Sequence, residues 1–424
     1  MSTLPRMERS GMTNHWSGER AEPVAVGPPR RRMTRAERIR AARNRRKRRW
    51  AGGLAVGLLI VVVIGAVFLG SKMWHSLFGG NDFTGDGVAD VVIQVHDGDS
   101  TTAIGKTLQE HNIVATASVF VDAAEGNDAI SAIQPGFYKM RTEIPAANAV
   151  ARLSDPKNRV GKLTIPEGRQ LDDVRDVKTN AVTEGILTLI SRATCVDLDG
   201  DRHCVSADAL KNVAATAAPA SLGVADWAVG PVQAMGDDHR RLEGLIAAGT
   251  WNIDPSAQPQ EILTNLISTS ATQYANGGLL ETAAAMDMSP YEILIVGSLV
   301  QRESTPEDFA KVARVIYNRL AENRTLEFDS TVNYPLDRIE VATTDADRAQ
   351  RNDWNTYVRP GLPATPICSP STAALTAAEN PAPGDWLYFV TIDMQGTTLF
   401  TRDYPQHLAN IELARRNGVL DSAR

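Results

Sequence analysis

An apolar run of twenty residues without a charge or a proline, Ala51–Gly70, divides this chain into two unequal parts. A helix rises about 1.5 Å per residue, so a run of this length spans about 30 Å, the thickness of the hydrocarbon core of a membrane. The sequence therefore predicts a transmembrane helix over residues 50–70, preceded by a tail of residues 1–49 and followed by a linker of residues 71–89.

Charge is distributed unevenly on the two sides of this run. Residues 1–49 contain 15 Lys and Arg and 4 Asp and Glu, whereas the other 375 residues contain 29 and 46. The net charge of −6 thus combines a basic tail with an acidic body. By the positive-inside rule, we expect the tail in the cytoplasm and the body outside the cell membrane.

Two other interpretations of these segments are open. The basic tail could bind nucleic acid, although a role in topology and in contacts with anionic lipids is favoured. The apolar run could be a cleaved signal peptide, but it is longer than a typical signal core, follows a long basic segment and lacks a clear small-residue cleavage site. We therefore expect a single-pass membrane protein with no nucleic-acid partner.

The chain has three cysteines, all in the acidic body. Cys195 and Cys204 flank a polar loop and are expected to form a disulfide in an oxidising compartment, whereas Cys368 is expected to be free and buried. Aspartates in the same loop resemble a calcium-binding loop, but Arg202 stands where such a loop needs glycine. A turn closed by a disulfide is therefore favoured, and no metal site is predicted.

The acidic body begins with a small β-α pattern at residues 90–160. A β-rich run, a turn at Asp97-Gly98-Asp99 and a helix capped by Ser100 or Thr101 are followed by another strand and helix. From residue 161 the pattern partly recurs, and it predicts a helix with one apolar face made by Leu171, Val174 and Val177. The Ala-rich stretch at about residues 185–235 is expected to be a peripheral insert.

The segment from Ser289 to Thr305 carries the clearest chemical signal. Ser289, followed by a proline and by a glutamate three residues on, is a capping-box helix start, and Thr305 repeats the signal. The helix between them, residues 290–303, must end near Glu303, whose side chain shares a face with apolar residues three, four and seven positions earlier.

A buried face and a helix C-terminus both disfavour negative charge, so the pKa of Glu303 is expected to be raised, as a general acid requires. A plainer interpretation makes Glu303 a helix-end residue paired with Arg302. The seven histidines form no zinc motif, and no nucleophilic-serine or phosphate-loop motif is present. Cys368 has no histidine nearby in the sequence. Among these classes of active site, the one that remains is carboxylate chemistry of the kind that enzymes use on sugars.

Several segments, which occur in the same order as the motifs of one known family, support this interpretation. They are "GSLVQRES", "VARVIYNRL", "LEFDSTV", "WNTYVRPGLPATPICSPS", "NPAPGDWLYFV" and "FTRDYPQHLANI", with "TIPEG", "PGFYKM" and "LEG" upstream. Through them the chain resembles the YceG-like family of endolytic murein transglycosylases over about residues 90–415.

The resemblance implies roles for individual residues. The catalytic glutamate of the family falls on Glu303, and a second glutamate of that motif falls on Gln301. Further positions of the substrate cleft fall on Asp329, Asn355, Thr356 and Tyr357. The chain departs from the family at Ser330, where proline is usual, and around Glu243, whose flanking motif is altered.

The resemblance also implies a fold and an activity. The fold is α+β, with a LysM-like module at residues 90–160 and a YceG-like catalytic domain at residues 161–424. The activity is cleavage of the MurNAc-β-1,4-GlcNAc bond of nascent peptidoglycan to leave 1,6-anhydroMurNAc ends, without a cofactor, and peptidoglycan synthases are expected partners. Two alternatives are a catalytically weak glycan-binding scaffold and a hydrolase that uses Asp329 as a second carboxylate.

Overall fold

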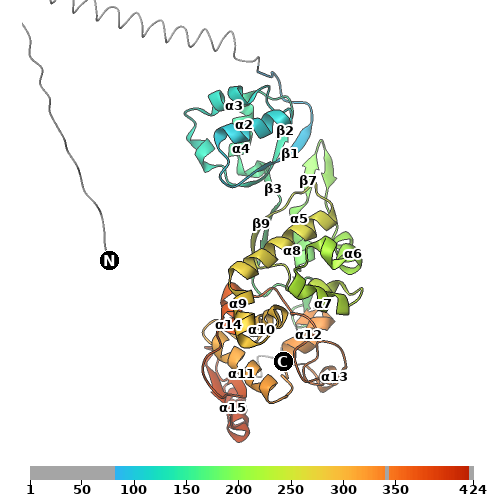
Figure 1. Cartoon of the computed structure of the whole chain (residues 1–424), viewed down its shortest axis with the longest axis vertical. Helices are drawn as coiled ribbons and strands as arrows, with labels where there is room; N and C mark the ends of the chain where they lie inside the picture. Colours follow the sequence, from blue (N-terminus) through green and yellow to red (C-terminus); the bar gives the residue numbers. More distant parts are fainter. Residues whose placement is uncertain (1–81, 340–342, 420–424) are drawn as a thin grey trace, which may run out of the picture. The chain divides into compact units, whose positions relative to one another are not determined.

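The computed structural model describes residues 82–339 and 343–419 (Figure 1). The predicted tail, the predicted transmembrane helix and most of the linker lie outside these ranges. Within them, no single helix is long and apolar enough to cross a membrane. The helices α9 (Leu279–Met286) and α10 (Pro290–Glu303) together reach that length and hydropathy, with a bend of 101° between them. The described residues form a mixed α+β structure, as predicted.

The first part of the described chain is a small module with its own sheet and core. Strand β1 pairs antiparallel with β2, and β2 with β3. Two helices separate β1 from β2 where the sequence pattern predicts one, because Thr116 caps an additional helix by accepting a hydrogen bond from the Val119 N–H. The elements are β1 (Asp90–Val95), α2 (Thr101–Glu110), α3 (Ala117–Ala124), β2 (Gly136–Arg141), α4 (Ala146–Ser154) and β3 (Arg159–Val160).

This module folds around buried side chains that form a cluster of their own. Ile93, Leu108, Phe120, Met140 and Val150, one from each of its main elements, are almost completely buried there. Apolar residues recur every second position along β1 and every third or fourth position along the helices, so their side chains point into the same core. The module therefore has a core separate from that of the rest of the body.

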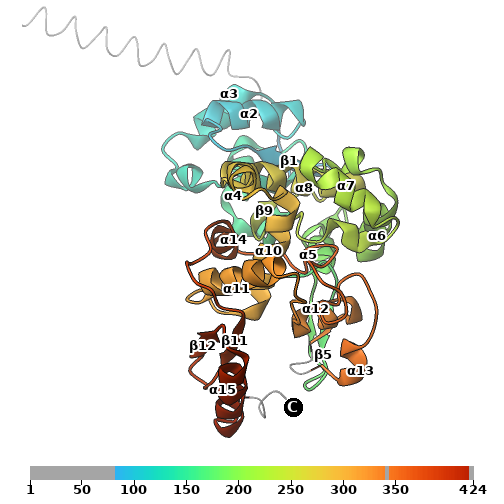
Figure 2. The same cartoon turned by 60° about the horizontal axis from the view of Figure 1, so that its bottom comes forward.

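The second part contains short strands and longer helices (Figure 2). Strands β4 and β9, β7 and β8, and β11 and β12 pair antiparallel, while β5 lies between antiparallel β6 and parallel β10. The strands are β4 (Lys162–Ile165), β5 (Val174–Asp176), β6 (Val182–Thr183), β7 (Val196–Leu198), β8 (Asp201–His203), β9 (Gly249–Asn252), β10 (Arg338–Ile339), β11 (Tyr388–Thr391) and β12 (Thr398–Thr401). Besides α9 and α10, the helices are α5 (Ile186–Ala193), α6 (Ala207–Thr216), α7 (Asp226–Ala234), α8 (Pro259–Asn276), α11 (Phe309–Ala321), α12 (Asp329–Asn333), α13 (Asp345–Arg348), α14 (Thr372–Glu379) and α15 (Tyr404–Arg416).

Helix α10 lies at the centre of this part. Every residue from 293 to 300 is buried, so the helix is covered on all sides and not along one stripe. Gly297 allows close packing, because a Cβ atom at this position would lie 3.3 Å from the Leu375 side chain of α14. Such a helix is held in one place by its neighbours, and its C-terminal residue is held with it.

The structure corrects two expectations for this part. Residues 174–176 form strand β5 instead of a helix, and Val177 is 53% exposed, so the apolar spacing there does not mark a buried helical face. The Ala-rich stretch is not peripheral, since Ile190 of α5, Leu210 of α6 and Val232 of α7 are fully buried in the same core as α10. Small side chains give a weak periodic signal even where helices pack closely.

The disulfide expected from the sequence is present. Cys195 and Cys204 are bonded across the β7–β8 hairpin, and Cys368 is free and buried. The loop is short, and the hairpin residues 199–204 are exposed.

Removal of this disulfide is expected to lower stability moderately. Closing a loop of this length removes chain entropy from the unfolded state worth about 2–3 kcal/mol. Cys195→Ser/Cys204→Ser should therefore lower the free energy of unfolding in urea by that amount and leave turnover within about twofold, because the hairpin contributes no residue to the site described below. A loss of activity without a loss of stability would contradict this expectation.

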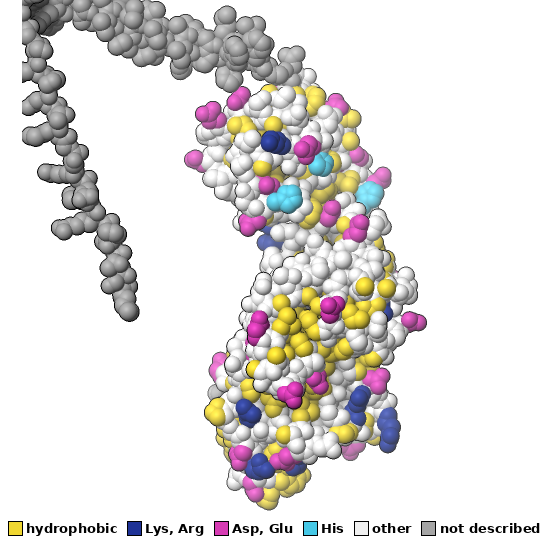
Figure 3. All heavy atoms as spheres, viewed as in Figure 1, with side chains coloured by type: hydrophobic (Ala, Val, Ile, Leu, Met, Phe, Trp, Pro, Cys, Tyr) yellow, Lys and Arg dark blue, Asp and Glu magenta, His cyan; other side chains and the backbone are white. Residues whose placement is uncertain are grey.

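The described surface reflects the charge split seen in the sequence. Acidic side chains are spread over the face shown in Figure 3, with fewer basic ones between them. The body is thus acidic on this face as well as in composition.

Candidate active site

Helix α10 places Glu303 at its last position. The Ser289 side chain accepts a hydrogen bond from the Glu292 N–H and the Glu292 side chain accepts one from the Ser289 N–H, which is the predicted capping box. The helix ends at Glu303, as predicted. The following helix begins later than expected, at Phe309, because residues 305–308 form a turn before it.

Glu303 is only partly open to solvent. Its Oε1 atom accepts a hydrogen bond from the Ser330 hydroxyl group, and part of the side chain reaches solvent. Burial raises the pKa of Glu303 to about 7, with Asp329 acting in the same direction and with Ser330 and Arg302 opposing the rise. Glu303 can therefore hold a proton near neutral pH and remain accessible to a ligand.

The residues opposite Glu303 come from the start of α12. Asp329, the first residue of this short helix, accepts hydrogen bonds from the Tyr357 hydroxyl group at 2.8 Å and from Thr343 at 2.6 Å. Arg348 of α13 pairs with the other oxygen of Asp329 at 3.0 Å and stacks over the Tyr357 ring. Both carboxylate oxygens of Asp329 are thus engaged by neighbours, and 28% of its side chain is exposed.

Asn355 and Thr356, which the resemblance places in the substrate cleft, lie inside the protein. Both are fully buried. The Asn355 side-chain amide donates to the backbone carbonyl groups of Arg348 and Gln350, and the Thr356 hydroxyl group accepts the Phe328 N–H at 3.1 Å. Thr356 therefore holds the segment that carries Asp329 and Ser330, and Asn355 holds the segment that carries Arg348. Polar atoms in such buried positions need partners.

Gln301 is also occupied by a contact within the protein. Its side-chain oxygen accepts the Ser371 N–H at 2.8 Å at the N-cap of α14. The turn at Gly168, which has a φ of +71°, also lies beside Gln301. A Cβ atom at position 168 would be 3.5 Å from the Gln301 side chain. Gln301 thus joins two loops to the last turn of α10.

Two residues matter more than the sequence suggested. Ser330 is visible in the sequence only as a departure from a family pattern, yet it donates directly to Glu303. Glu243 is 1% exposed and accepts hydrogen bonds from the Leu171 N–H at 3.0 Å and from the Tyr334 hydroxyl group at 2.9 Å. Burial raises the pKa of Glu243 to about 8. A signal for Glu243 existed in the segment "LEG", but its burial could not be read from it.

One carboxyl group with a raised pKa ends a buried helix, and the neighbouring aspartate is held by hydrogen bonds to other side chains. This arrangement defines a candidate site for acid–base chemistry by a single carboxyl group. The chain belongs to the YceG-like family, whose model matches residues 93–413.

Relatives from bacteria share the same region. Endolytic murein transglycosylases of Streptococcus pneumoniae serotype 2 and of Bacillus subtilis are 23% and 24% identical to the chain over 341 and 325 residues. The alignments cover 76% of this chain in both cases, and 58% and 84% of those proteins, so the chain spans little more than half the length of the pneumococcal relative. A crystal structure of a YceG-like protein from Listeria monocytogenes, 22% identical, superposes with a TM-score of 0.49 and covers 76% of this chain and 98% of that one.

Proposed function

We propose that this chain is an endolytic murein transglycosylase, in which Glu303 acts first as an acid and then as a base. The observation that carries the proposal is the position of Glu303, a partly open carboxyl group whose pKa is raised to about 7 by burial, at the family's glutamate position. Membership of the YceG-like family and the names of the relatives support the same activity.

The proposed reaction needs only one carboxyl group. Protonated Glu303 donates its proton to the glycosidic oxygen as the bond between MurNAc and GlcNAc breaks. The resulting carboxylate then takes the proton from the C6 hydroxyl group of the same MurNAc, whose oxygen closes the 1,6-anhydro ring. Glu303 is thereby protonated again, and no water molecule or cofactor is consumed.

The surroundings of Asp329 favour this route over hydrolysis. A hydrolase of this type needs a second carboxylate that is free to activate water or to attack the sugar. Asp329 is instead engaged by Tyr357, Thr343 and Arg348. We propose that Asp329 and Tyr357 line the glycan side of the site, and that Gln301, Asn355 and Thr356 act by holding the loops around it.

Product analysis tests the proposed reaction. The full-length chain would be incubated with peptidoglycan glycan strands and the products separated and weighed by mass spectrometry. We expect internal cleavage and ends that are lighter by one water than ordinary reducing ends. Reducing ends alone would show a hydrolase, and glycan binding without any product would show a scaffold.

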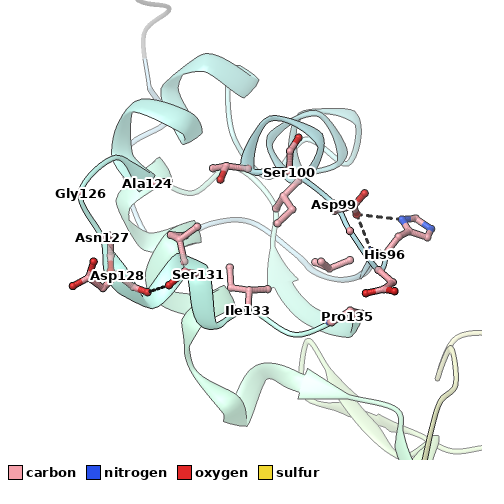
Figure 4. A pocket seen from close by; sticks show the side chains of 16 residues that line it. His96, Asp99, Ser100, Ala124, Gly126, Asn127, Asp128, Ser131, Ile133 and Pro135 are labelled. Atoms are coloured by element: carbon pink, nitrogen blue, oxygen red, sulfur yellow. Dashed lines mark hydrogen bonds and ion pairs between the residues drawn. The ribbon is translucent and has the colours of Figure 1, made fainter.

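The small module at residues 90–160 is proposed to hold glycan near this site. Its strand, two helices and strand support the LysM-like interpretation. A cavity of about 600 Å³ lies between the turn after β1 and the segment before β2 (Figure 4). His96 and Asp99 belong to the first of these, joined by a 2.7 Å hydrogen bond from the His96 N–H, and Asn127 and Ser131 to the second. With an anchor at residues 50–70, both parts would act outside the cell membrane, close to newly made strands and to their synthases.

Replacement of Ser330 should shift the pH dependence of the reaction. The Ser330 hydroxyl group donates to Glu303 and so stabilises its ionised form. Ser330→Ala should therefore raise the pKa of Glu303 further, and the high-pH limb of kcat/KM should move upward by roughly one pH unit, since the first step needs the protonated acid.

Ser304, which directly follows Glu303 in the chain, provides a matched control for this shift. The Ser304 hydroxyl group has no hydrogen-bond partner among the described residues. Ser304→Ala should thus leave the high-pH limb in place. If Ser330→Ala lowers the rate equally at all pH values, Ser330 affects the shape of the loop and not the proton affinity of Glu303.

A further inference from the structure

A further carboxyl group in an unusual position lies at the end of α14. Glu379, the last residue of α14, is only 8% exposed, and among the described residues no hydrogen bond or ion pair reaches its side chain. Its Oε1 atom is completely inaccessible. Burial of a carboxyl group without a partner is costly, so such a group marks a place where a polar ligand would be stabilised. The reaction proposed above does not use it.

Glu379 lines a small cavity between α14 and the C-terminal end of α8. The cavity measures about 90 Å³. Gln273, Thr372 and Thr376 line it and are also exposed, so the cavity opens to solvent beside them. The other lining residues are mostly apolar and include Ala247, Ala248, Tyr274, Pro370 and Leu375.

The size and the walls of this cavity restrict what it can hold. A water molecule occupies about 30 Å³ in the liquid, so the cavity accepts a group of about three or four heavy atoms. Apolar walls suit a short alkyl chain, while a buried carboxylate and two threonine hydroxyl groups suit a cation that can donate hydrogen bonds. A metal ion fits poorly, because no group of three or more potential metal-binding side chains occurs among the described residues.

We propose that the Glu379 cavity binds a primary alkylammonium group, such as the end of a lysine-like side chain, with Glu379 as its counter-ion. The ammonium group donates hydrogen bonds to Glu379 and to the hydroxyl groups at the entrance, and the alkyl chain packs against Leu375 and Ala248. Binding provides the partner that Glu379 lacks within the protein. The site is separate from the chemistry at Glu303.

Thermal unfolding of the full-length chain with ethylammonium chloride tests this binding. A ligand that binds only the folded state raises the unfolding temperature in a saturable way. We expect a rise of about 2 °C or more at saturating ethylammonium. Ethanol, which is neutral, and tetramethylammonium chloride, which has no N–H group, should produce no saturable rise at equal concentration.

Two variants locate the effect. Glu379→Gln removes the charge without changing the shape and should weaken ethylammonium binding at least about tenfold. Ala248→Leu places a larger side chain at a lining residue of the cavity and should abolish binding with Glu379 intact. The exposed Glu281→Gln on α9 is the matched control and should bind as the wild type does. Ser371 lines the cavity, and its N–H group donates to Gln301 on the last turn of α10. A change in the cavity could therefore alter turnover indirectly, so the experiment measures binding.

A further arm distinguishes the source of the amine. If an amine carried on a peptide can enter, a tripeptide with a central lysine should stabilise the chain and its side-chain-acetylated form should not. Stabilisation by ethylammonium alone would restrict the site to free small amines. Equal stabilisation by ethylammonium and ethanol, or undiminished binding in Glu379→Gln, would overturn the proposal, whatever the activity of Glu303.

Discussion

Glu303→Gln is expected to lower turnover of glycan strands about a thousandfold, which corresponds to roughly 4 kcal/mol of transition-state stabilisation. The amide has the shape of the carboxyl group and can still accept the Ser330 hydrogen bond, but it can neither donate the proton nor take it back. The fold should be unaffected, because the change removes a buried charge without leaving a cavity. Steady-state product formation, measured beside the urea-unfolding curve of each protein, checks both statements.

The control for this variant is a glutamate a few residues away. Glu307 is exposed in the turn after α10, and Glu307→Gln should keep activity within about twofold. Retention of more than a tenth of wild-type turnover by Glu303→Gln would show that another group supplies the proton. In that case the proposed acid–base role would be wrong even though the family assignment would stand.

The stability of the chain is expected to fall as pH rises from about 5 to 9, with the largest single contribution from Glu243. Its folded-state pKa is raised to about 8 from an ordinary value of 4.5. Below the ordinary value both states hold the proton; between the two values the unfolded chain releases it and the folded chain keeps it. The free energy of unfolding therefore decreases across this interval, by roughly 3–5 kcal/mol for a group buried this deeply.

Comparison with a neutral variant isolates this effect. Glu243→Gln should remove the contribution of Glu243 to the decrease between pH 5 and 9 in urea unfolding, and the exposed Glu281→Gln should keep the whole decrease. Two other groups do not confuse the comparison. Asp172, whose pKa is lowered to about 2 by its hydrogen bonds with His239 and Lys211, loses its contribution only below this interval, and Glu303 contributes equally to both proteins. An identical pH dependence for wild type and Glu243→Gln would contradict the prediction.

Several parts of the structure were predictable because they depend on neighbouring residues alone. The capping box at Ser289 and the apolar run after it predicted helix α10 to within a residue at both ends. The spacing of Cys195 and Cys204 predicted a disulfide that closes a short hairpin. The prediction failed at residues 174–176, where an apolar spacing of three predicted a helix and a short strand paired with β6 and β10 is present.

The sequence by itself determined that a carboxyl group ends an apolar helix, because caps and periodicity act within one or two helical turns. Only the tertiary structure decided what surrounds that carboxyl group: Ser330 lies 27 residues from Glu303 in the chain yet donates to it, and Tyr357 lies 28 residues from Asp329. It likewise placed Asn355 and Thr356 inside the protein as supports, and buried Glu243. Burial and hydrogen bonding between distant segments depend on how the whole core packs, and no local pattern encodes them.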